Sequence, residues 1–224
     1  MNHVKIATLN IQHGGGRRIP AILDFLIRLD SDALVLSEYR LNDKELSANL
    51  RDAGYCFQVV GSALPNENTV MIASREPFEP LLVSQRIASV KLNSFTLFGV
   101  YFPQGEEKRS VYEKLKTAIN DAGDPALVMG DFNTGIHYQD ETGKSFACAD
   151  SFESLKDIGL VDSWRVRNPL LREFSWYSSQ GNGFRIDHAF CSKELDQKVS
   201  NVEYIHTSRE LKMTDHSALV VEIF

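Results

Sequence analysis

The chain has 224 residues and a formal net charge of -6, from 24 Lys and Arg against 30 Asp and Glu, and 43% of its residues are hydrophobic. These proportions are typical of folded globular proteins and exclude a chain that is mainly disordered. No apolar run reaches the length of a membrane span, and the three cysteines are too far apart for a disulfide framework or a CxxC zinc site. We therefore expect a single domain over residues 1–224, in the cytoplasm and away from membranes.

Short apolar runs alternate with polar turns along the whole sequence. The runs are rich in Val, Ile, Leu and Phe, and many are too short for helices, so we interpret them as β-strands. The predicted strands cover residues 4–10, 33–37, 55–60, 69–74, 88–92, 96–101, 126–129, 185–190, 199–206 and 218–224. Helical spacing of apolar residues predicts helices over 19–29, 108–121 and 149–158, and the last is followed by Gly159, a typical C-cap.

The order of these elements predicts the fold class. The strands at 69–74, 88–92 and 96–101 follow one another without a helix, which favours antiparallel pairing. Other strands are separated by helices. We therefore expect an α/β fold with largely antiparallel sheets rather than a doubly wound parallel sheet. The irregular stretch 134–148 is expected to be a surface loop.

Polar side chains stand repeatedly at the ends of the predicted strands. They are Asn10, Glu38, Tyr101, Asp131, Asn133 and Asp187, together with Asp215 and His216 just before the last strand. If that strand is antiparallel to its neighbours, its start lies at the edge where theirs end, and the segments converge on one site. Each residue alone also has a structural interpretation: Glu38 as a solvated strand end, Asp131 as a turn cap, or His216 as a satisfied histidine.

Three of these side chains suit a metal ion. Glu38 and Asp215 offer carboxylate oxygens, and Asn10 offers an amide oxygen. Hard oxygen ligands of this kind favour Mg2+ or Mn2+ over zinc. We therefore expect Mg2+ (or Mn2+) as the cofactor.

The other polar residues suit the hydrolysis of a phosphoester. A carboxylate beside an amide, as in Asp131 and Asn133, can hold and deprotonate an attacking water. A histidine paired with a carboxylate, as in His216 with Asp187, has a fixed tautomer and can donate to a phosphate oxygen. A serine hydrolase fits less well, because the sequence has no G-x-S-x-G motif.

A set of short motifs resembles a known family. They are TLN (8–10), LSE (36–38), GVYFPQGE (99–106), MGDFN (129–133), GLVDSWR (159–165), FSW (174–176), RIDHAFCS (185–192) and TDHSALV (214–220). In this order they resemble the endonuclease/exonuclease/phosphatase superfamily, and most closely the exonuclease III-type AP endonucleases. The resemblance implies a four-layer sandwich of two mostly antiparallel β-sheets flanked by helices, the DNase I-like fold.

The same resemblance implies a metal site and a catalytic set. Glu38 is the principal metal ligand in this interpretation, with Asn10 and Asp215 beside it. The family often has an acidic residue two places after the asparagine, and Gln12 stands there in this chain. One carboxylate is therefore missing near the metal, which could loosen its binding.

The resemblance assigns catalytic roles to the remaining residues. Tyr101 contacts the scissile phosphate. Asp131 activates the water, and Asn133 helps to orient the water and the phosphate. His216 contacts the phosphate, and Asp187 orients His216.

An apolar pocket that accepts a flipped-out abasic sugar is the third implication. Its positions match Trp176, Phe184 and Ile186, with Arg185 between the last two as a further substrate contact. A sugar without a base fits an aromatic slot that a normal nucleotide overfills. The structural alternative is that Trp176 and Ile186 belong to the core.

We therefore expect a Mg2+-dependent phosphodiesterase that acts on DNA, damaged DNA included, as a monomeric nuclease of AP endonuclease or 3′-exonuclease type with a role in DNA repair. The chain is shorter than typical members of that branch, including between Trp176 and Arg185, where they carry DNA-contacting loops. One alternative keeps the site but acts on RNA, a nucleotide, a sugar phosphate or a lipid head group. A non-catalytic binding module is disfavoured, because the whole polar set is present.

The acidic net charge argues against strong binding to nucleic acid in general. The segment 164–185 nevertheless holds Arg165, Arg167, Arg172 and Arg185 against Glu173 alone. We therefore predict that any binding to DNA is local and strongly dependent on salt.

Overall fold

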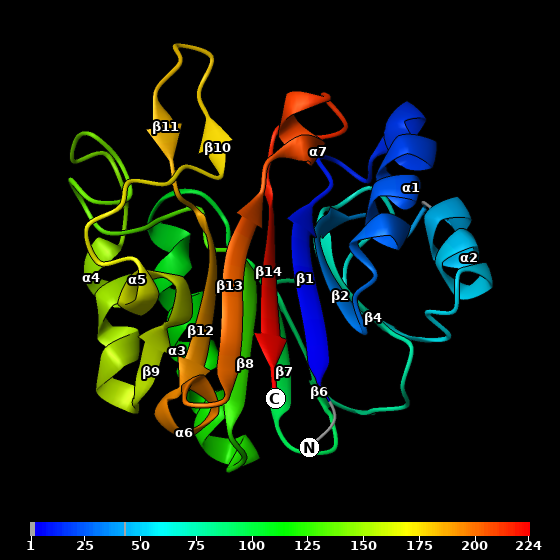
Figure 1. Cartoon of the computed structure of the whole chain (residues 1–224), viewed down its shortest axis with the longest axis horizontal. Helices are drawn as coiled ribbons and strands as arrows, with labels where there is room; N and C mark the ends of the chain where they lie inside the picture. The colour runs from blue at the N-terminus through cyan, green and yellow to red at the C-terminus, as the bar shows by residue number, and fades with distance from the viewer. Residues whose placement is uncertain (1–2, 43) are drawn as a thin grey trace.

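Two β-sheets pack face to face in the centre of the protein, and helices cover their outer faces (Figure 1). The computed structural model describes residues 3–42 and 44–224. The first sheet contains β1 (Val4–Asn10), β2 (Ala33–Tyr39), β3 (Phe57–Val60), β4 (Thr69–Ser74), β13 (Val199–Ile205) and β14 (Ala218–Ile223). Their order across the sheet is β13-β14-β1-β2-β4-β3.

The second sheet also has six strands. It contains β5 (Glu79–Val83), β6 (Ile87–Lys91), β7 (Thr96–Tyr101), β8 (Ala126–Asp131), β9 (Leu160–Asp162) and β12 (Asp187–Ser192). Their order is β5-β6-β7-β8-β12-β9. A separate two-stranded sheet of β10 (Trp176–Tyr177) and β11 (Gly183–Phe184) projects beyond one edge of the sandwich (Figure 1).

Helices form the two outer layers. The longer ones are α1 (Ile19–Leu29) and α2 (Lys44–Asp52) on the first sheet, and α3 (Lys108–Ala122) on the second. The shorter ones are α4 (Ala149–Glu153), α5 (Ser163–Arg167), α6 (Lys193–Asp196) and α7 (Thr207–Glu210), with 3-10 turns at Gly16–Arg18, Gly105–Glu107 and Ser154–Ile158. The predicted four-layer α/β sandwich is confirmed.

Both faces of the central strands are apolar, because each face packs against another layer. In β2, Val35 belongs to the core between the two sheets, whereas Leu34 and Leu36 pack with the residues of α1. In β8, Met129 lies in the same central core, and Val128 packs with the residues of α3 on the outer face. Successive side chains thus pack into cores on opposite faces, which explains why the sequences of these strands are apolar throughout.

Most predicted elements are present. All ten predicted strands are found, with ends that differ by two residues at most, and the helix over 19–29 is reproduced. The predicted helix 149–158 is α4 followed by a 3-10 turn, and Gly159 has the left-handed conformation of a C-cap. The prediction missed α2, in which only Leu46 and Leu50 are buried, and several elements of two to five residues.

The stretch 134–148 is irregular as expected, but it is more than a surface loop. Thr134, Asp140, Glu141 and Cys148 are buried. The carboxylate of Glu141 accepts hydrogen bonds from the backbone N–H groups of Ser145 and Phe146, which fixes the end of the stretch.

The pairing of the strands decides where the polar residues meet. Strand β14 is antiparallel to β1, and β12 is antiparallel to β8 with Asp187 opposite Asp131. The starts of β12 and β14 therefore lie at the edge where β1 and β8 end. Strands β1 and β2, and strands β7 and β8, are parallel, so their carboxyl ends share that edge.

Candidate active site

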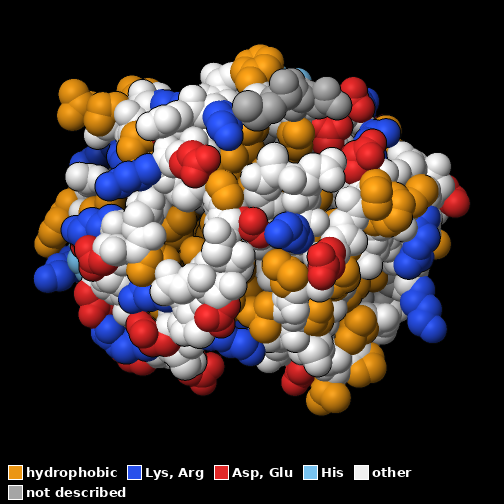
Figure 2. Space-filling model, turned by 90° about the horizontal axis from the view of Figure 1, so that it is seen from below, with side chains coloured by type: hydrophobic (Ala, Val, Ile, Leu, Met, Phe, Trp, Pro, Cys, Tyr) orange, Lys and Arg blue, Asp and Glu red, His pale blue; other side chains and the backbone are white. Residues whose placement is uncertain are grey.

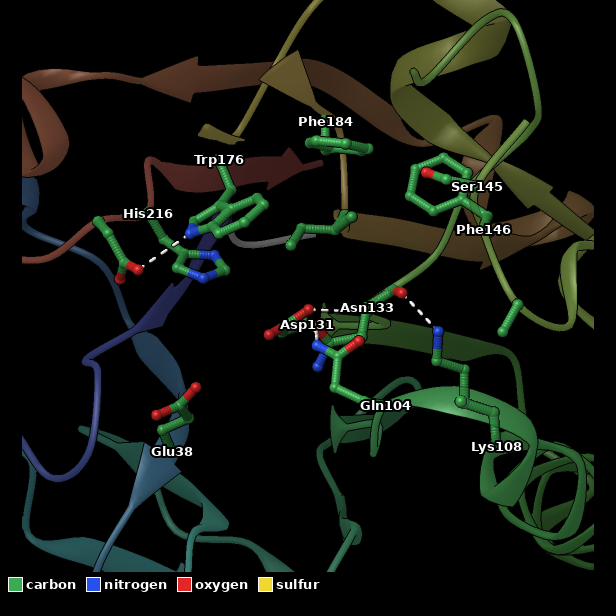
Figure 3. Close-up of a pocket in the computed structure, with 14 residues that line it drawn as sticks. Glu38, Gln104, Lys108, Asp131, Asn133, Ser145, Phe146, Trp176, Phe184 and His216 are labelled. Carbon is green, nitrogen blue, oxygen red and sulfur yellow. Dashed lines mark hydrogen bonds between the residues drawn. The ribbon is translucent and has the colours of Figure 1, made fainter. Parts of the chain in front are cut away.

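A cavity of about 470 Å³ opens at this edge, and side chains from both sheets line it (Figure 3). Trp176 and Phe184 lie on one side of it, and Gln104 and Lys108 lie on the opposite side. The complete lining is Glu38, Gln104, Gly105, Lys108, Asp131, Asn133, Ser145, Phe146, Ala147, Trp176, Phe184, Ile186, Asp215 and His216. The predicted polar residues are therefore brought together, with Asn10 and Asp187 buried among them.

Glu38 lies at an irregularity of β2 rather than at a solvated strand end. Ser37 and Tyr39 pair with consecutive residues of β4, so Glu38 is left out of the ladder as a bulge. Its φ angle is 58°, a left-handed conformation that costs a residue with a side chain about 1–3 kcal/mol. The carboxylate accepts hydrogen bonds from the His13 backbone N–H at 2.8 Å and from Asn68 Nδ2 at 2.9 Å. The bulge is therefore locally destabilising, but it places a carboxylate at the cavity.

Asn10 connects the two sheets beneath the cavity. Its Nδ2 donates to Asp131 Oδ2 at 2.9 Å and to Glu38 Oε1 at 3.1 Å. Its Oδ1 accepts the backbone N–H of Gln12 at 2.8 Å. In this arrangement Asn10 donates to two carboxylates, and its oxygen, the atom expected to bind a metal, accepts one backbone hydrogen bond.

Asp131 is 1% exposed and follows Gly130, a position where no side chain fits. A Cβ atom on Gly130 would lie 2.0 Å from the backbone oxygen of Val100, so the close approach of β7 and β8 requires its absence. Asp131 Oδ1 accepts the backbone N–H of Asn133 at 2.7 Å. Burial raises the pKa of Asp131 to about 7, with a further contribution from the charge of Asp187.

Asn133 shows that a turn role and a site role are compatible. Its φ angle is 51°, and its side-chain Nδ2 donates to the backbone oxygen of Phe102 at 2.8 Å. Its Oδ1 accepts a hydrogen bond from Gln104 Nε2. The residue therefore caps the turn after β8 and also lines the cavity.

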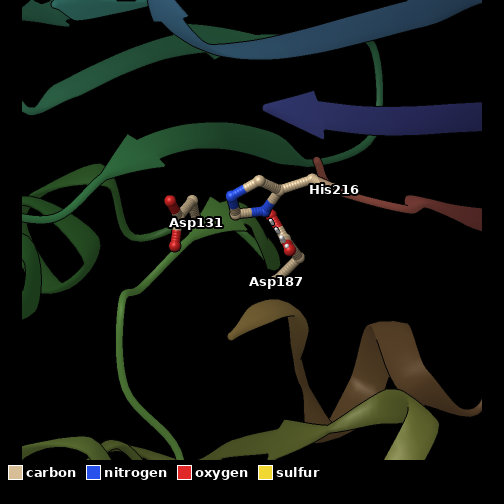
Figure 4. Close-up of side chains that lie close together, drawn as sticks. All are labelled: Asp131, Asp187 and His216. Carbon is tan, nitrogen blue, oxygen red and sulfur yellow. Dashed lines mark hydrogen bonds and ion pairs between the residues drawn. The ribbon is translucent and has the colours of Figure 1, made fainter. Parts of the chain in front are cut away.

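His216 lies between two carboxylates (Figure 4). Its Nδ1 is 2.8 Å from Asp187 Oδ2, and its other nitrogen is on the side of Asp131. Burial alone would lower the pKa of His216, but Asp187, Asp131 and Asp215 raise it to about 10. The second oxygen of Asp187, Oδ1, is buried without a hydrogen-bond partner. The imidazole is therefore held as a cation with an N–H available above the cavity floor.

Two groups of residues could hold a metal ion. Ligand atoms of Asp131, Asp187 and His216 lie within 4.8 Å of one another. The carboxylates around His216 raise its pKa, so a metal ion bound to this cluster would have to displace the imidazole proton. Glu38 and Asp215 line the cavity and offer only oxygen atoms. This second set fits a hard divalent cation.

The aromatic side of the cavity contains the three predicted pocket residues. The ring centroids of Trp176 and Phe184 are 5.7 Å apart, and Ile186 is nearly buried beside them. Trp176 Nε1 donates to Asp215 Oδ2 at 2.9 Å. Phe146, which was not predicted, adds a third ring at 5.7 Å from Phe184. The stretch 134–148 has no periodicity that would have singled out this residue.

Lys108 is a second lining residue that was missed. It is 1% exposed, and its Nζ donates to the backbone oxygen of Asn133. Burial lowers the pKa of its amine. Among the described residues, no carboxylate oxygen lies within 4.0 Å of it. A lysine at the start of a helix normally reaches solvent, so nothing in the sequence indicated a buried amine.

Arg185 does not lie at the cavity, which corrects the prediction that it binds substrate. Its side chain is fully buried, with Nε 2.7 Å from Asp140 Oδ1 and Nη2 2.6 Å from Asp162 Oδ2. Arg165 also pairs with Asp140, at 2.6 Å, and Arg167 pairs with Asp196 at 2.8 Å. The basic charge counted in this segment is therefore largely neutralised inside the protein.

Tyr101 stands at the Glu38 side of the edge, opposite Asp131 in the β7–β8 ladder. Its hydroxyl is 3.5 Å from Asn68 Nδ2, and the guanidinium of Arg86 lies over its ring at 5.0 Å. Burial raises the pKa of the phenol, and the charge of Glu38 adds to this effect. The hydroxyl is therefore a protonated donor.

One cavity thus combines a buried carboxylate, an imidazole paired with a second carboxylate, and two further carboxylates, which are groups that phosphoester hydrolysis uses. Residues 7–216 match the sequence model of the Endonuclease/Exonuclease/phosphatase family, and the chain belongs to this family.

Solved structures share the fold over nearly the whole chain. An AP endonuclease from Archaeoglobus fulgidus is 22% identical, with a TM-score of 0.85, over 97% of this chain and 98% of that one. The 3′ phosphatase NExo from Neisseria, bound to a product DNA hairpin, is 22% identical, with a TM-score of 0.88, over 99% of each chain. The 3′-5′ exonuclease NExo from Neisseria meningitidis is 23% identical, with a TM-score of 0.85, over 98% of this chain and 99% of that one.

Proposed function

We propose that the protein hydrolyses phosphoester bonds in DNA with the help of Mg2+ or Mn2+. The observation that carries this proposal is the buried cluster of Asp131, Asp187 and His216 at the floor of a cavity with an aromatic wall. The same cavity has Glu38 and Asp215 on its lining. General base, fixed donor and charge compensation are thus available around one substrate phosphate.

Each residue of the cluster has one task in this mechanism. Asp131 takes the proton of the attacking water, since its carboxylate is held in place by Asn10 Nδ2 and by the backbone N–H of Asn133. His216 donates a hydrogen bond to a phosphate oxygen. Asp187 holds the other ring nitrogen, so that the donating N–H keeps its direction.

Glu38 and Asp215 are the residues that would hold the cation, with Tyr101 as a nearby donor to the phosphate. A divalent cation held by these residues would offset the negative charge of the phosphate and of the leaving oxygen. Asn10 acts in this proposal as a support for Glu38 and Asp131, because its Nδ2 donates to both carboxylates. We expect activity to be lost in EDTA and restored by Mg2+ or Mn2+.

DNA is the proposed substrate for two reasons. Trp176, Phe184 and Phe146 form an aromatic wall that suits a sugar without its base. Solved proteins with the same fold include an AP endonuclease and a phosphatase bound to a DNA hairpin. Within the described residues, no helix has the length and apolar character needed to cross a membrane.

A second candidate is the removal of a terminal 3′-phosphate from DNA. A phosphomonoester carries one more negative charge than a diester. The buried amine of Lys108 lines the same cavity and has no carboxylate partner within 4.0 Å among the described residues. This unpaired cation would offset that additional charge.

The deciding experiment compares substrates under the same conditions. Purified protein with Mg2+ is incubated with a labelled duplex that holds one abasic site, an intact duplex, a nicked duplex with a 3′-phosphate, RNA, and 4-nitrophenyl phosphate. Cleavage at the abasic site supports the first candidate, and release of phosphate from the nick supports the second. Hydrolysis of the small ester alone would exclude DNA as the substrate. Absence of all hydrolysis would favour a binding module instead.

A further inference from the structure

A second cavity, of about 300 Å³, lies beside the catalytic one. It is lined by Gln12, Arg18, Tyr177, Arg209, Lys212, Thr214 and Asp215. We call it the basic cavity, because three of these side chains are cations and Asp215 alone is an anion. None of the three cations was predicted as a functional residue.

The two cavities share one wall. Asp215 lines both of them, and the two residues of β10 divide between them. Trp176 lines the catalytic cavity and Tyr177 the basic cavity, because consecutive side chains of a strand point to opposite faces. A chain-like substrate leaving the catalytic cavity past Asp215 would therefore enter the basic cavity.

The cations of the basic cavity have no acidic partners. Among the described residues, no carboxylate oxygen lies within 4.0 Å of Arg18, Arg209 or Lys212. Arg209 instead donates to Ser217 Oγ at 3.1 Å and stacks over the ring of Tyr177 at 4.6 Å, and Tyr177 is 40% exposed. A stacked guanidinium is held in place while its charge stays available.

Arg18 is likewise held in place by a neutral residue, Gln12, which leaves its charge uncompensated. The side-chain oxygen of Gln12 accepts from Arg18 Nη1, and its backbone oxygen accepts from Nη2 at 2.7 Å. A carboxylate at position 12 would accept the same hydrogen bond and also neutralise the arginine. The neutral amide positions the guanidinium without removing its charge.

This concentration of one charge is not general on the surface. At the opposite end of the sandwich, Lys and Arg side chains are interspersed with Asp and Glu and with hydrophobic groups (Figure 2). Several arginines elsewhere are paired with carboxylates, such as Arg109 with Asp150 at 2.7 Å and Arg167 with Asp196 at 2.8 Å. Three cations and one carboxylate around a single cavity therefore make this part of the surface locally basic in a protein whose net charge is -6.

We infer that the basic cavity binds a backbone phosphate of the nucleic acid strand, next to the phosphate held in the catalytic cavity. This inference rests on the proposed function and makes it more specific, because it requires a substrate with at least two phosphates. A polynucleotide meets that requirement, and a small phosphomonoester does not. Cations that contact backbone phosphates contribute affinity without sequence preference.

The test compares one DNA substrate with one small substrate. The double variant Arg209→Ala/Lys212→Ala is assayed on the DNA that the wild type cleaves and on bis(4-nitrophenyl) phosphate. We expect the KM for DNA to rise about tenfold, and the dependence of log kcat/KM on log salt to become shallower by about one for each cation removed. The ratio of DNA turnover to small-ester turnover should fall by the same factor.

A matched control removes the same charge elsewhere. Lys156→Ala/Lys193→Ala changes two lysines that line neither cavity, and it should leave both substrates unaffected. Gln12→Glu should raise the KM for DNA about threefold, because it neutralises Arg18 while keeping its hydrogen bond. If the DNA KM of the double variant equals that of the wild type, the inference is wrong and the proposed function stands. If the wild type hydrolyses only the small ester, both are wrong.

Discussion

Two buried clusters in this protein each place two aspartates around a cationic side chain. The pKa of Asp131 in one cluster is raised, whereas the pKa values of Asp140 and Asp162 in the other are lowered. At the cavity floor, Asp131 and Asp187 flank His216. Just before the start of β12, Arg185 lies between Asp140 and Asp162. Both consist of two carboxylates around a cation. Asp131, Asp187 and Asp140 are buried, and the side chain of Asp162 is 9% exposed.

The clusters differ in how well their hydrogen bonds are satisfied. Each carboxylate oxygen of Asp140 and Asp162 has a donor, with the Ile136 N–H on Asp140 Oδ2 and the Arg165 N–H on Asp162 Oδ1. Burial alone would raise the pKa of both acids, but the charge of Arg185 outweighs it and lowers both. At the cavity, Asp187 Oδ1 has no partner, and burial raises the pKa of Asp131 to about 7.

The difference separates a structural role from a chemical one. Arginine stays charged and offers a fixed fork of donors, and all three nitrogens of Arg185 donate to Asp140 or Asp162, away from the cavity. Histidine offers two N–H groups, and only one of them is used by Asp187. In the mechanism proposed above, the cavity cluster therefore keeps one N–H of His216 and the carboxylate of Asp131 available to a substrate.

The largest effect on stability should come from a change in the Arg185 cluster. Arg185→Met keeps much of the side-chain volume but leaves Asp140 and Asp162 without their shared cation. We expect the free energy of unfolding to fall by about 3–5 kcal/mol, which is typical of breaking a buried ion pair on one side. Urea denaturation followed by circular dichroism measures this change.

Two companion variants make that result specific. Arg185→Lys keeps the charge but loses the fork, so it should fall between the wild type and Arg185→Met. Arg28→Met, at an exposed pair with Asp24, should leave the denaturation midpoint nearly unchanged. Equal stability of Arg185→Met and the wild type would contradict the structural role given to this arginine.

The cavity cluster should show the reverse pattern. Asp131→Asn and His216→Ala should each lower kcat by about a hundredfold or more, because they remove the base and the phosphate donor. Asp131→Asn keeps the shape of the side chain, and we expect it to lower the free energy of unfolding less than Arg185→Met does. Steady-state kinetics on the cleaved DNA, beside the exposed variant Asp121→Asn, measures the difference. Near-normal turnover in both variants would refute the roles assigned to Asp131 and His216.

Sequence patterns located the strands and the polar edge for a clear physical reason. A strand buried on both faces must be apolar over its length, so Asn10 and Asp131 stand out where β1 and β8 end. The four-layer arrangement came from the family resemblance. Helix α2 was missed because it is short and mostly polar, with only two buried side chains.

Contacts between distant parts of the chain could not be read in the same way. Arg185 was predicted as a substrate contact, but it pairs with Asp140 and Asp162. These partners lie 45 and 23 residues away in the sequence, so no local pattern indicated the ion pairs. Phe146 and Lys108 reach the cavity through a loop conformation and a buried helix start. A single sequence contains no signal for such packing.

The smallest expected effect is a difference in acid stability that separates the two clusters. The pKa values of Asp140 and Asp162 are lowered in the folded protein, so in both cases the unfolded chain binds protons more readily. Their contribution to stability is therefore complete above the ordinary aspartate pKa of about 4 and is lost progressively as the pH falls below it. Asp140→Asn removes one of these two groups and should make the loss of stability between about pH 4 and pH 2 shallower than in the wild type. Urea midpoints measured across that range test the expectation, and Asp121→Asn, which changes an exposed acid, should follow the wild-type curve. Parallel curves for Asp140→Asn and the wild type would mean that the Arg185 cluster does not govern the acid limit of the fold.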